Sequence, residues 1–472
     1  MAKSSCKSSS RSTGRQKAPR QRFSKRYPRI EDMPVIHRHA AGIDLGGDIS
    51  HFVALEVGDE VEVREFGAMT PDLYALVAYL IEHKVTTVAM EATGVYWMPL
   101  YDMLEAAAFE VYLVNPSHVK NVPGRHKDDK LDSRWLQKLH KYGLLSASFR
   151  PSEEIRPLRS LHRQRVRLVR LSADEIRRTQ KALDIMNVRI HKAITDLFGV
   201  TGQRIVRSII AGERDPAVLA AMRDPRCQST EEELVEALTG HYQQHQVIAL
   251  TQALERYDFL TAQIDALDKE IESYLVSVIP LPDEDIAAKI AAATQQFAKG
   301  KHAPQYNVAA YVDVFTGRDP TCLPGVGPQI AFGLLAELGR DMTKWPSDKH
   351  FGSFLSLAPQ QKISGGKVLS TKTRPGSHPG AALFRQAATA VIRTDSALAA
   401  FYRRLAVRIG TAKALTATAY KIARMYYHLM RDGLAYVELG EKQYEDKYRK
   451  QQIASLEKKA KRLGFVVTQV AA

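Results

Sequence analysis

The spacing of apolar residues changes several times between Ala40 and about Leu145, which is typical of short strands that alternate with helices. Three apolar runs joined by tight turns predict the first three strands, in "AGIDLGG", "HFVALEV" and "EVEVREF". Helical spacing follows in "PDLYALVAYLIEHK", "YWMPLYDMLEAAA" and "KLDSRWLQKLHKYGL", and buried strands are predicted in "VTTVAM" and "FEVYLV". Three meander strands followed by alternating helices and strands predict an α/β domain whose sheet has mixed strand directions.

The rest of the chain is predicted to be mainly helical. From about Pro151 to Ile279, apolar residues recur every three or four positions, which predicts long antiparallel helices or a coiled coil. We interpret these helices as a dimerising or spacing element. The arginine-rich face of the first helix is more typical of a solvated surface than of a phosphate-binding one. A second compact region extends from about Asn307 to Leu439, and the tail that follows is highly charged.

The amino end has the composition of a disordered basic arm. Ser, Lys and Arg are abundant up to about Ile36, and no acidic residue precedes Glu31. A solubilising tail and a nucleic-acid-binding arm explain this composition equally well. The boundaries predicted for the whole chain are 1–36 (arm), 37–150 (α/β domain), 151–295 (helical linker and dimerisation region), 296–440 (C-terminal domain) and 441–472 (charged tail).

Net charge narrows the range of partners. The 472 residues carry a formal net charge of +15 and the sequence pI is about 9.5, so a polyanionic partner is expected. A membrane is the weaker option, because no apolar run reaches the roughly 18 residues of a membrane helix and no signal-peptide stretch opens the chain. The three cysteines are far apart, which disfavours zinc and disulfides and suits a reducing cytosol. We therefore expect a cytoplasmic protein.

Four acidic residues occupy positions that suit a metal site. Asp44 ends the first predicted strand and Glu91 follows the central one, and strand carboxyl ends share one crevice in such a sheet. Asp129 and Asp132 are three residues apart, so they project from the same face of the predicted helix. Two like charges about 4 Å apart repel by about 4 kcal/mol at an effective dielectric constant of about 20, so this cluster is costly without cations.

Hard carboxylate oxygens at this density suit Mg²⁺ or Mn²⁺. Two such ions could stabilise both the attacking and the leaving oxygen of a phosphodiester. Taken singly, each acid is more typical of a turn or a helix cap, and Asp128 or Asp129 could serve as an N-cap. Their joint placement favours the metal site.

The order of these motifs resembles that of the transposases of insertion-sequence family 110. The resemblance runs from about Ala40 to Leu439 and rests on "GIDLG", "MEATGVYW", "NPSHVK", "KDDKLDS", "CLPGVG" and "LSLAPQQKISGGK". It implies a ribonuclease H-like (RuvC-like) catalytic domain at 37–150 and a C-terminal transposase domain at 296–440. By position, it implies that the family's four acids are Asp44, Glu91, Asp129 and Asp132 and that its catalytic serine is Ser364.

The sequence departs from the family pattern in places. Gly46, Gly47 and Asp48 stand where members of the family often have Ser-Lys after the first acid. Asp128 adds an acid within "KDDKLDS" that could compete as a metal ligand. The pattern near 296–320 is irregular, and no element is assigned there.

The resemblance also implies a reaction and partners. Such enzymes excise their element as a circle and insert it at a target site, while a structured RNA encoded by the element pairs with donor and target DNA. We therefore expect Mg²⁺-dependent strand cleavage and rejoining through a phosphoserine intermediate, with double-stranded DNA and a guide (bridge) RNA as partners. Holding two duplexes requires at least a dimer, or a tetramer in the synaptic complex, and a prokaryotic, nucleoid-associated location is implied.

The loop that contains Ser364 is rich in glycine and basic residues. Glycines let backbone N–H groups approach a phosphate closely, and a lysine can neutralise its charge. No histidine is adjacent in sequence, although His350 and His378 flank the loop, so we expect the acidic cluster of another domain or subunit to activate the serine. A plain flexible turn is the structural alternative. The residues expected to contact phosphates here are Gly365, Gly366, Lys367, Lys372 and Arg374.

A second glycine-rich segment, "LPGVGPQIA", resembles the hairpin of helix-hairpin-helix motifs. In that arrangement Gly325 and Gly327 would let the following helix offer N–H groups to a nucleic-acid phosphate. The alternative is an ordinary Gly/Pro connector between helices.

Other functions remain open from the sequence alone. A RuvC-like structure-specific nuclease would cleave DNA without using Ser364, and a DNA invertase would use the same chemistry on different sites. A non-catalytic nucleic-acid-binding protein with a degenerate nuclease fold is a third alternative, against which the four intact acids argue.

Overall fold

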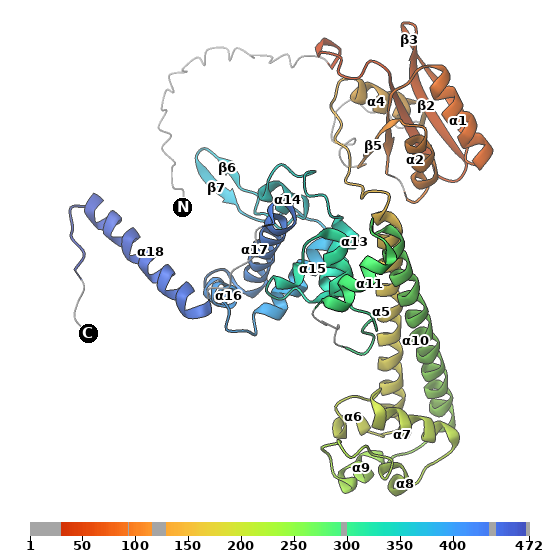
Figure 1. The fold of residues 1–472 in the computed structure, drawn as a ribbon, viewed down its shortest axis with the longest axis vertical. Coiled ribbons are helices and arrows are strands. Elements are labelled where there is room, and N and C mark those ends of the chain that lie inside the picture. Colours follow the sequence, from red (N-terminus) through yellow and green to blue (C-terminus); the bar gives the residue numbers. More distant parts are fainter. Residues whose placement is uncertain (1–29, 93, 116–128, 294–299, 434–439, 469–472) are drawn as a thin grey trace, which may run out of the picture. The chain divides into compact units, whose positions relative to one another are not determined.

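The computed structural model describes residues 30–92, 94–115, 129–293, 300–433 and 440–468. Contacts divide the chain after Arg150 into two compact units, which we describe separately (Figure 1). Most of the predicted basic arm, as well as Asp128, lies outside the described residues. None of the helices in the described ranges is both long enough and apolar enough to cross a membrane.

The first unit is built on a mixed sheet whose order is β3-β2-β1-β4-β5. β1, β2 and β3 form an antiparallel meander, while β4 and β5 run parallel to β1. The predicted α/β sheet with mixed strand directions and a ribonuclease H-like arrangement is therefore confirmed. The strands are β1 (Ala40–Gly46), β2 (Ser50–Val57), β3 (Glu60–Gly67), β4 (Thr87–Glu91) and β5 (Glu110–Val114).

Alternation of side chains along the strands gives this sheet two different faces. Ile43 and Met90 belong to the core that α1 and α2 cover, whereas Ala89 packs on the other face against Leu136 of α4. Residues two positions apart share a face, so the polar residues next to Ile43 and Met90 lie on the side of α4. The helices are α1 (Thr70–Glu82), α2 (Trp97–Ala106) and α4 (Asp129–Lys141), and a short turn of 3₁₀ helix, η1 (Ile30–Asp32), precedes the sheet.

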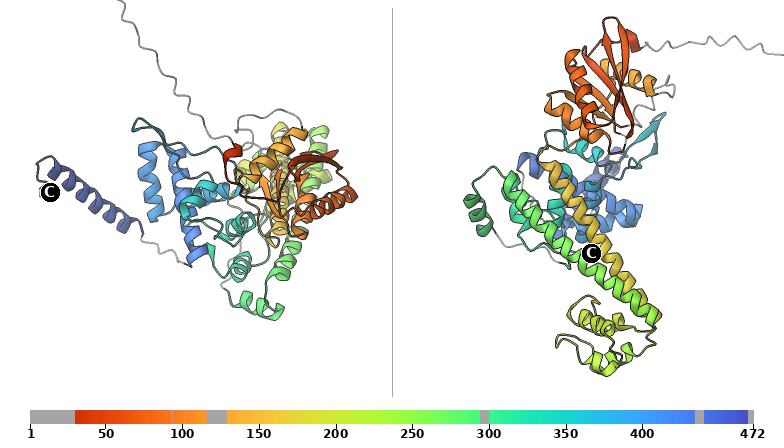
Figure 2. Two further views of the ribbon diagram at one scale, coloured as in Figure 1. Left: turned by 90° about the horizontal axis from the view of Figure 1, so that it is seen from above. Right: turned by 90° about the vertical axis from the view of Figure 1, so that its right-hand side faces the viewer.

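Two long helices form the stem of the second unit. α5 (Ile155–Ile185) and α10 (Gln244–Val278) run antiparallel and side by side (Figure 1, Figure 2), as the apolar spacing predicts. Arg165 of α5 is buried between them, where its guanidinium donates to the carboxylate of Asp268. The arginine-rich face of α5 is therefore only partly solvated, because a partner 103 positions away covers one of its arginines.

A small helical bundle joins the far ends of these two helices and has its own apolar core. The helical spacing in the sequence continues to Ile190, but α5 ends at Ile185. Asn187 then adopts a φ of 56°, a left-handed conformation that asparagine tolerates better than most residues. The bundle consists of α6 (Ile190–Ala193), α7 (Val200–Ala211), α8 (Pro216–Ala220) and α9 (Glu231–Leu238).

Among its described residues, the remainder of the second unit is helical apart from one hairpin. Its core contains the fully buried rings of Phe351, Phe384, Tyr426 and Tyr427. Part of the segment near 296–320, to which the sequence assigned no element, forms α12. The elements are α11 (Asp283–Ala292), α12 (Val308–Thr316), η2 (Pro320–Cys322), α13 (Pro328–Leu338), α14 (Asp348–Phe354), β6 (Lys362–Ser364), β7 (Lys367–Ser370), α15 (Pro379–Val391), α16 (Ala397–Ile409), α17 (Thr411–Asp432) and α18 (Gly440–Arg462).

Candidate active site

Two of the predicted metal ligands lie on neighbouring parallel strands. β1 and β4 are paired so that Ile43 is next to Met90, and Asp44 and Glu91 are the next residues along each strand. Because Ile43 and Met90 point into the α1 and α2 core, the side chains of Asp44 and Glu91 belong to the opposite face. Both residues lie at the carboxyl ends of their strands, where the sequence predicts a shared crevice.

Helix α4 covers that face and brings the third acid to the same end of the sheet. A Cβ added to Gly42 would be 2.2 Å from the backbone nitrogen of Gln137, so strand and helix are in direct backbone contact. In the last turn of α4, His140 Nε2 is 2.8 Å from the Thr87 hydroxyl at the start of β4. The helix therefore begins near the carboxyl ends of β1 and β4, and its first turn carries Asp132.

The four acids differ in burial. Glu91 and Asp132 are 6% and 8% exposed, Asp44 is half-buried, and Asp129 is exposed in the first turn of α4. An acid in that turn also stabilises the amino end of the helix, whatever else it binds. The structure thus brings Asp44, Glu91 and Asp132 to one end of the sheet and leaves Asp129 at its margin.

The donor chemistry of these side chains fits a hard divalent cation, because Mg²⁺ and Mn²⁺ prefer carboxylate oxygens. Within the described ranges, however, no three His, Cys, Asp or Glu side chains form a group that could hold a metal ion. The acids are therefore neighbours in the fold, and their carboxylates are not gathered into a closed ligand group.

Ser364 lies at the end of a tight hairpin in the second unit. β6 and β7 pair antiparallel with Ser364 opposite Lys367, and the two residues between them, Gly365 and Gly366, have φ values of 55° and 76°. Positive φ at both positions is the type I′ geometry that glycine favours in two-residue hairpin loops. Ser364 and Lys367 are exposed, and because they lie opposite each other in the pairing, their side chains leave the hairpin on the same face.

Backbone contacts continue the pairing of the two arms below β6 and β7, and a side chain joins the base of the hairpin to the segment after α14. Pro359 forms an isolated bridge with Thr373, and the Lys372 carbonyl accepts a hydrogen bond of 3.1 Å from the Gln360 amide. Arg374 donates to the Ser353 carbonyl at 3.3 Å. Lys372 and Arg374 are both exposed, so they remain available to a polyanion.

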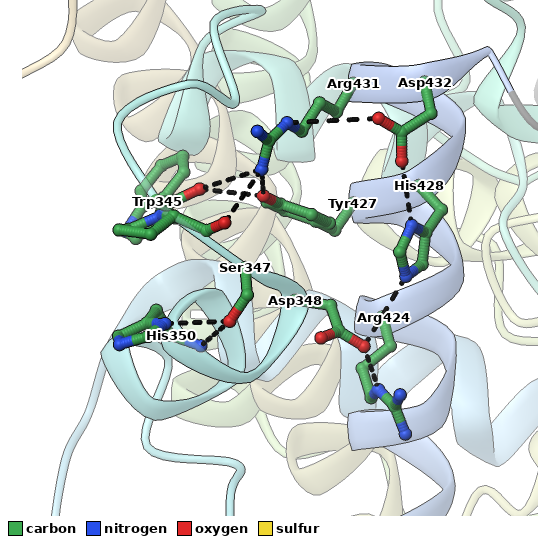
Figure 3. Close-up of polar contacts among 10 residues, drawn as sticks. Trp345, Ser347, Asp348, His350, Arg424, Tyr427, His428, Arg431 and Asp432 are labelled. Atoms are coloured by element: carbon green, nitrogen blue, oxygen red, sulfur yellow. Dashed lines mark hydrogen bonds and ion pairs between the residues drawn. The ribbon is translucent and has the colours of Figure 1, made fainter.

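Neither flanking histidine contacts Ser364. In the described part of the chain the Ser364 hydroxyl forms no hydrogen bond, while His350 Nδ1 is 2.8 Å from the Ser347 hydroxyl (Figure 3). His378 caps α15 by accepting from the Gly380 amide, and burial lowers the pKa of His378 to about 4. Neither histidine is therefore placed to act as a base for Ser364.

A polar network that sequence reasoning missed holds α14 on α17 (Figure 3). The Asp348 carboxylate accepts from Arg424 and lies 3.5 Å from His428, which in turn lies 2.9 Å from Asp432. Burial raises the pKa of Asp348, but the hydrogen bond and charge of Arg424 outweigh it and hold that pKa below its usual range. The four-residue spacing of Arg424, His428 and Asp432 was the readable signal, although their partner is 76 positions from Arg424.

The two glycines of "LPGVGPQIA" have different structural roles. Gly325 has a φ of 75°, and a Cβ there would be 2.2 Å from the Ala387 carbonyl, so it is needed for packing on α15. Gly327 precedes α13, and no described atom lies within 4 Å of the position of its missing Cβ. Gly327, rather than Gly325, therefore leaves room for a ligand at the amino end of α13.

Comparisons with protein families match both parts of this arrangement. Residues 41–188 match a DEDD-type model described as "Transposase", and residues 321–403 match the model "Transposase IS116/IS110/IS902 family". The first span contains the four acids and the second contains Ser364 and both glycine-rich segments. The chain is thus a DNA transposase, an enzyme of DNA recombination.

More narrowly, the chain belongs to the IS110 family of transposases, as the sequence motifs indicate. The presence of a DEDD transposase domain indicates dependence on a divalent metal ion. Comparison with curated proteins gave no match.

Proposed function

We propose that this transposase excises and inserts its element by Mg²⁺-dependent strand cleavage and rejoining through a phosphoserine intermediate on Ser364. The metal would be held by Asp44, Glu91, Asp129 and Asp132. The observation that carries the proposal is the register of β1 and β4, which makes Asp44 and Glu91 neighbours beneath the first turn of α4.

The bound ion would supply positive charge to the phosphate and to the developing charge on the leaving oxygen. Ser364 Oγ attacks the phosphorus atom, and the bond from phosphorus to the strand's leaving oxygen breaks. The serine proton passes to a carboxylate of the acidic residues, in the same chain or in a second copy, and the leaving oxygen takes up a proton. Attack by the hydroxyl of another DNA end then releases Ser364 and restores one phosphodiester.

The hairpin geometry supports this role for the serine. Ser364 is exposed next to a two-glycine turn, so little steric bulk separates its hydroxyl from an approaching strand. Lys367 on the same face would neutralise the phosphate during attack. Lys372 and Arg374 at the base of the hairpin would hold the strand without reading its sequence.

We further propose that a structured RNA from the element selects donor and target DNA by base pairing. A net charge of +15 supports binding to RNA and DNA together. In guided systems the protein need not encode the target sequence, because pairing supplies it. Since two duplexes must be held, the working unit would be at least a dimer, and a tetramer in the synaptic complex.

The test uses the full chain with Mg²⁺, the element's RNA and a labelled DNA carrying an element end. A covalent protein–DNA adduct should form with the native chain and should be absent from Ser364→Ala. Thr371→Ala, which removes an exposed hydroxyl from the same loop, should form the adduct normally. Strand cleavage by Ser364→Ala at the native rate, with no adduct, would instead establish a nuclease.

The acids have a separate readout. Glu91→Gln and Asp132→Asn should stop cleavage and weaken Mn²⁺ binding, measured by calorimetry in the absence of DNA. Unchanged Mn²⁺ affinity in both variants would show that Glu91 and Asp132 are not metal ligands.

A further inference from the structure

A groove in the second unit separates one face of α5 from the first turns of α13 and α15. Its volume is about 690 Å³. Arg163, Arg167 and Arg170 line it from α5, and their spacing of four and three residues places them on one face of that helix. The function proposed above does not use this groove.

Only some of these arginines are neutralised by the protein itself. Arg163 donates two hydrogen bonds, of 2.7 and 2.8 Å, to the carboxylate of Glu337, whose side chain is 2% exposed. Arg165, which also lines the groove, donates a hydrogen bond to the carboxylate of Asp268 and is paired with it. Glu337 is the sole acid among the described residues that line the groove, and its charge is already balanced.

Arg167 and Arg170 have no hydrogen-bond or ion-pair partner anywhere in the described residues, and both are exposed. On a convex surface this would indicate nothing more than solvation. Here the two guanidinium groups border a concavity whose walls include Val166, Val169 and Leu383. Apolar walls exclude water, and the lower local dielectric strengthens attraction for an anion.

The opposite wall adds backbone donors. Gln329 and Ile330 line the groove from the first turn of α13, and among the described residues their amides have no backbone acceptor. N–H groups at a helix amino end point along its axis and carry partial positive charge. They follow Gly327, where a missing Cβ leaves open space.

We propose that this groove binds a single phosphodiester strand, with Arg167 and Arg170 on successive phosphates and the first turn of α13 facing the backbone from the other side. Guanidinium groups bind phosphate oxygens in a bidentate manner, and the valine and leucine side chains suit sugars and base faces. The inference rests on the proposed function, since it takes nucleic acid to be the substrate. RNA and DNA strands share this chemistry, so the experiment has one arm for each.

The experiment compares the full native chain with the double variant Arg167→Gln/Arg170→Gln. Fluorescence anisotropy measures the affinity for labelled single strands of RNA and DNA of the same sequence over a range of KCl concentrations. Loss of two phosphate contacts on a single strand lowers the slope of log K against log salt by about 1.4, which is about 25-fold in affinity at 0.1 M KCl. A loss in the RNA arm alone assigns the groove to the guide, a loss in the DNA arm alone assigns it to a DNA strand, and an equal loss in both arms supports a phosphodiester site that accepts either strand.

Arg177→Gln/Arg178→Gln is the matched control. It removes the same charge from the same helix, but Arg177 and Arg178 pair with Asp174 and Glu175 and do not line the groove. The control should keep the native slope. An equal fall of the salt slope in both double variants would mean that only the net charge of the chain matters, and it would overturn the proposal.

An unchanged slope in both arms would also overturn it. If the double variant kept the native salt slope but differed from the native chain in oligomeric state, measured by analytical ultracentrifugation, the groove would bind an acidic protein segment instead of a nucleic-acid strand. Formation of the covalent DNA adduct by the native chain is measured in parallel. A missing adduct counts against the proposed function, whereas a normal adduct with an unchanged slope counts against the groove alone.

Discussion

The backbone contact between β1 and α4 at Gly42 gives a sharp test of the acidic site. A methyl group at Gly42 would be 2.2 Å from the Gln137 nitrogen and 2.5 Å from the Ser133 carbonyl oxygen. Ordinary contact begins at 3.4 Å, so Gly42→Ala has to push the helix away by about 1.2 Å. Both opposing atoms belong to the backbone, so no side-chain rotation can relieve the clash.

Displacement of α4 carries Asp132 away from the carboxyl ends of β1 and β4. A shift of about 1 Å in catalytic geometry costs on the order of 100-fold in rate. Overpacking of this kind also lowers the free energy of unfolding by about 1–3 kcal/mol. We therefore expect Gly42→Ala to remain folded and to cleave DNA about 100-fold more slowly than the native chain.

The assay is single-turnover strand cleavage in Mg²⁺, with thermal unfolding measured on the same samples. Gly58→Ala is the control: its φ is 63°, and no described atom lies within 4 Å of the added Cβ. That substitution costs roughly 1–2 kcal/mol through backbone strain and does not press on α4. Should Gly42→Ala cleave at the native rate, or lose no more rate than Gly58→Ala, the docking of α4 would not govern the site.

Three further predictions concern stability and binding. Asp268→Ala leaves Arg165 buried without its carboxylate and should lower the free energy of unfolding by about 3–5 kcal/mol in urea titrations, whereas an unchanged value would mean that water reaches Arg165. Burial lowers the pKa of His140 to about 4. Between pH 6.5 and 4 the His140 ring is therefore protonated in the unfolded chain but neutral in the folded chain. The free energy of unfolding should therefore fall by up to about 3 kcal/mol as the pH drops through that window. In urea titrations at pH 7 and pH 5, His140→Gln should show a smaller fall than the native chain, because it lacks the group that titrates. Lys372→Gln/Arg374→Gln should weaken nucleic-acid binding for all sequences and flatten its salt dependence. An unchanged salt slope would show that neither side chain contacts the nucleic acid.

Local patterns were enough to predict the first unit. Each strand from β1 to β5 has a run of apolar or alternating residues bounded by turn residues, and each helix has apolar spacing near 3.6. The role of Gly42 could not be predicted in the same way. It depends on docking against Gln137, 95 positions later in the sequence, and nothing near Gly42 indicates that a helix will pack there.

The second unit shows where sequence reasoning stops. The arginines of α5 form one uniform pattern in the sequence, yet Arg165 is buried against Asp268, Arg163 is paired with Glu337, and Arg167 is unpaired within the described chain. Partners between 103 and 174 positions away decide which arginine is neutralised. Periodicity predicts the face of a helix, whereas long-range pairing determines its effective charge.

The two parts of the proposed active site also differ in how firmly the fold holds them. Asp44 and Glu91 lie on β1 and β4, which are each paired on both sides, so the sheet fixes their backbone. Ser364 lies on an isolated two-stranded hairpin that exposes Ile363 and Leu369, and such hairpins have little stability of their own in water. Metal ligands have to be held within about 0.5 Å, whereas a serine that is joined to DNA and then released has to move between steps. The rigid sheet and the lightly held hairpin therefore suit the separate demands of metal binding and strand transfer.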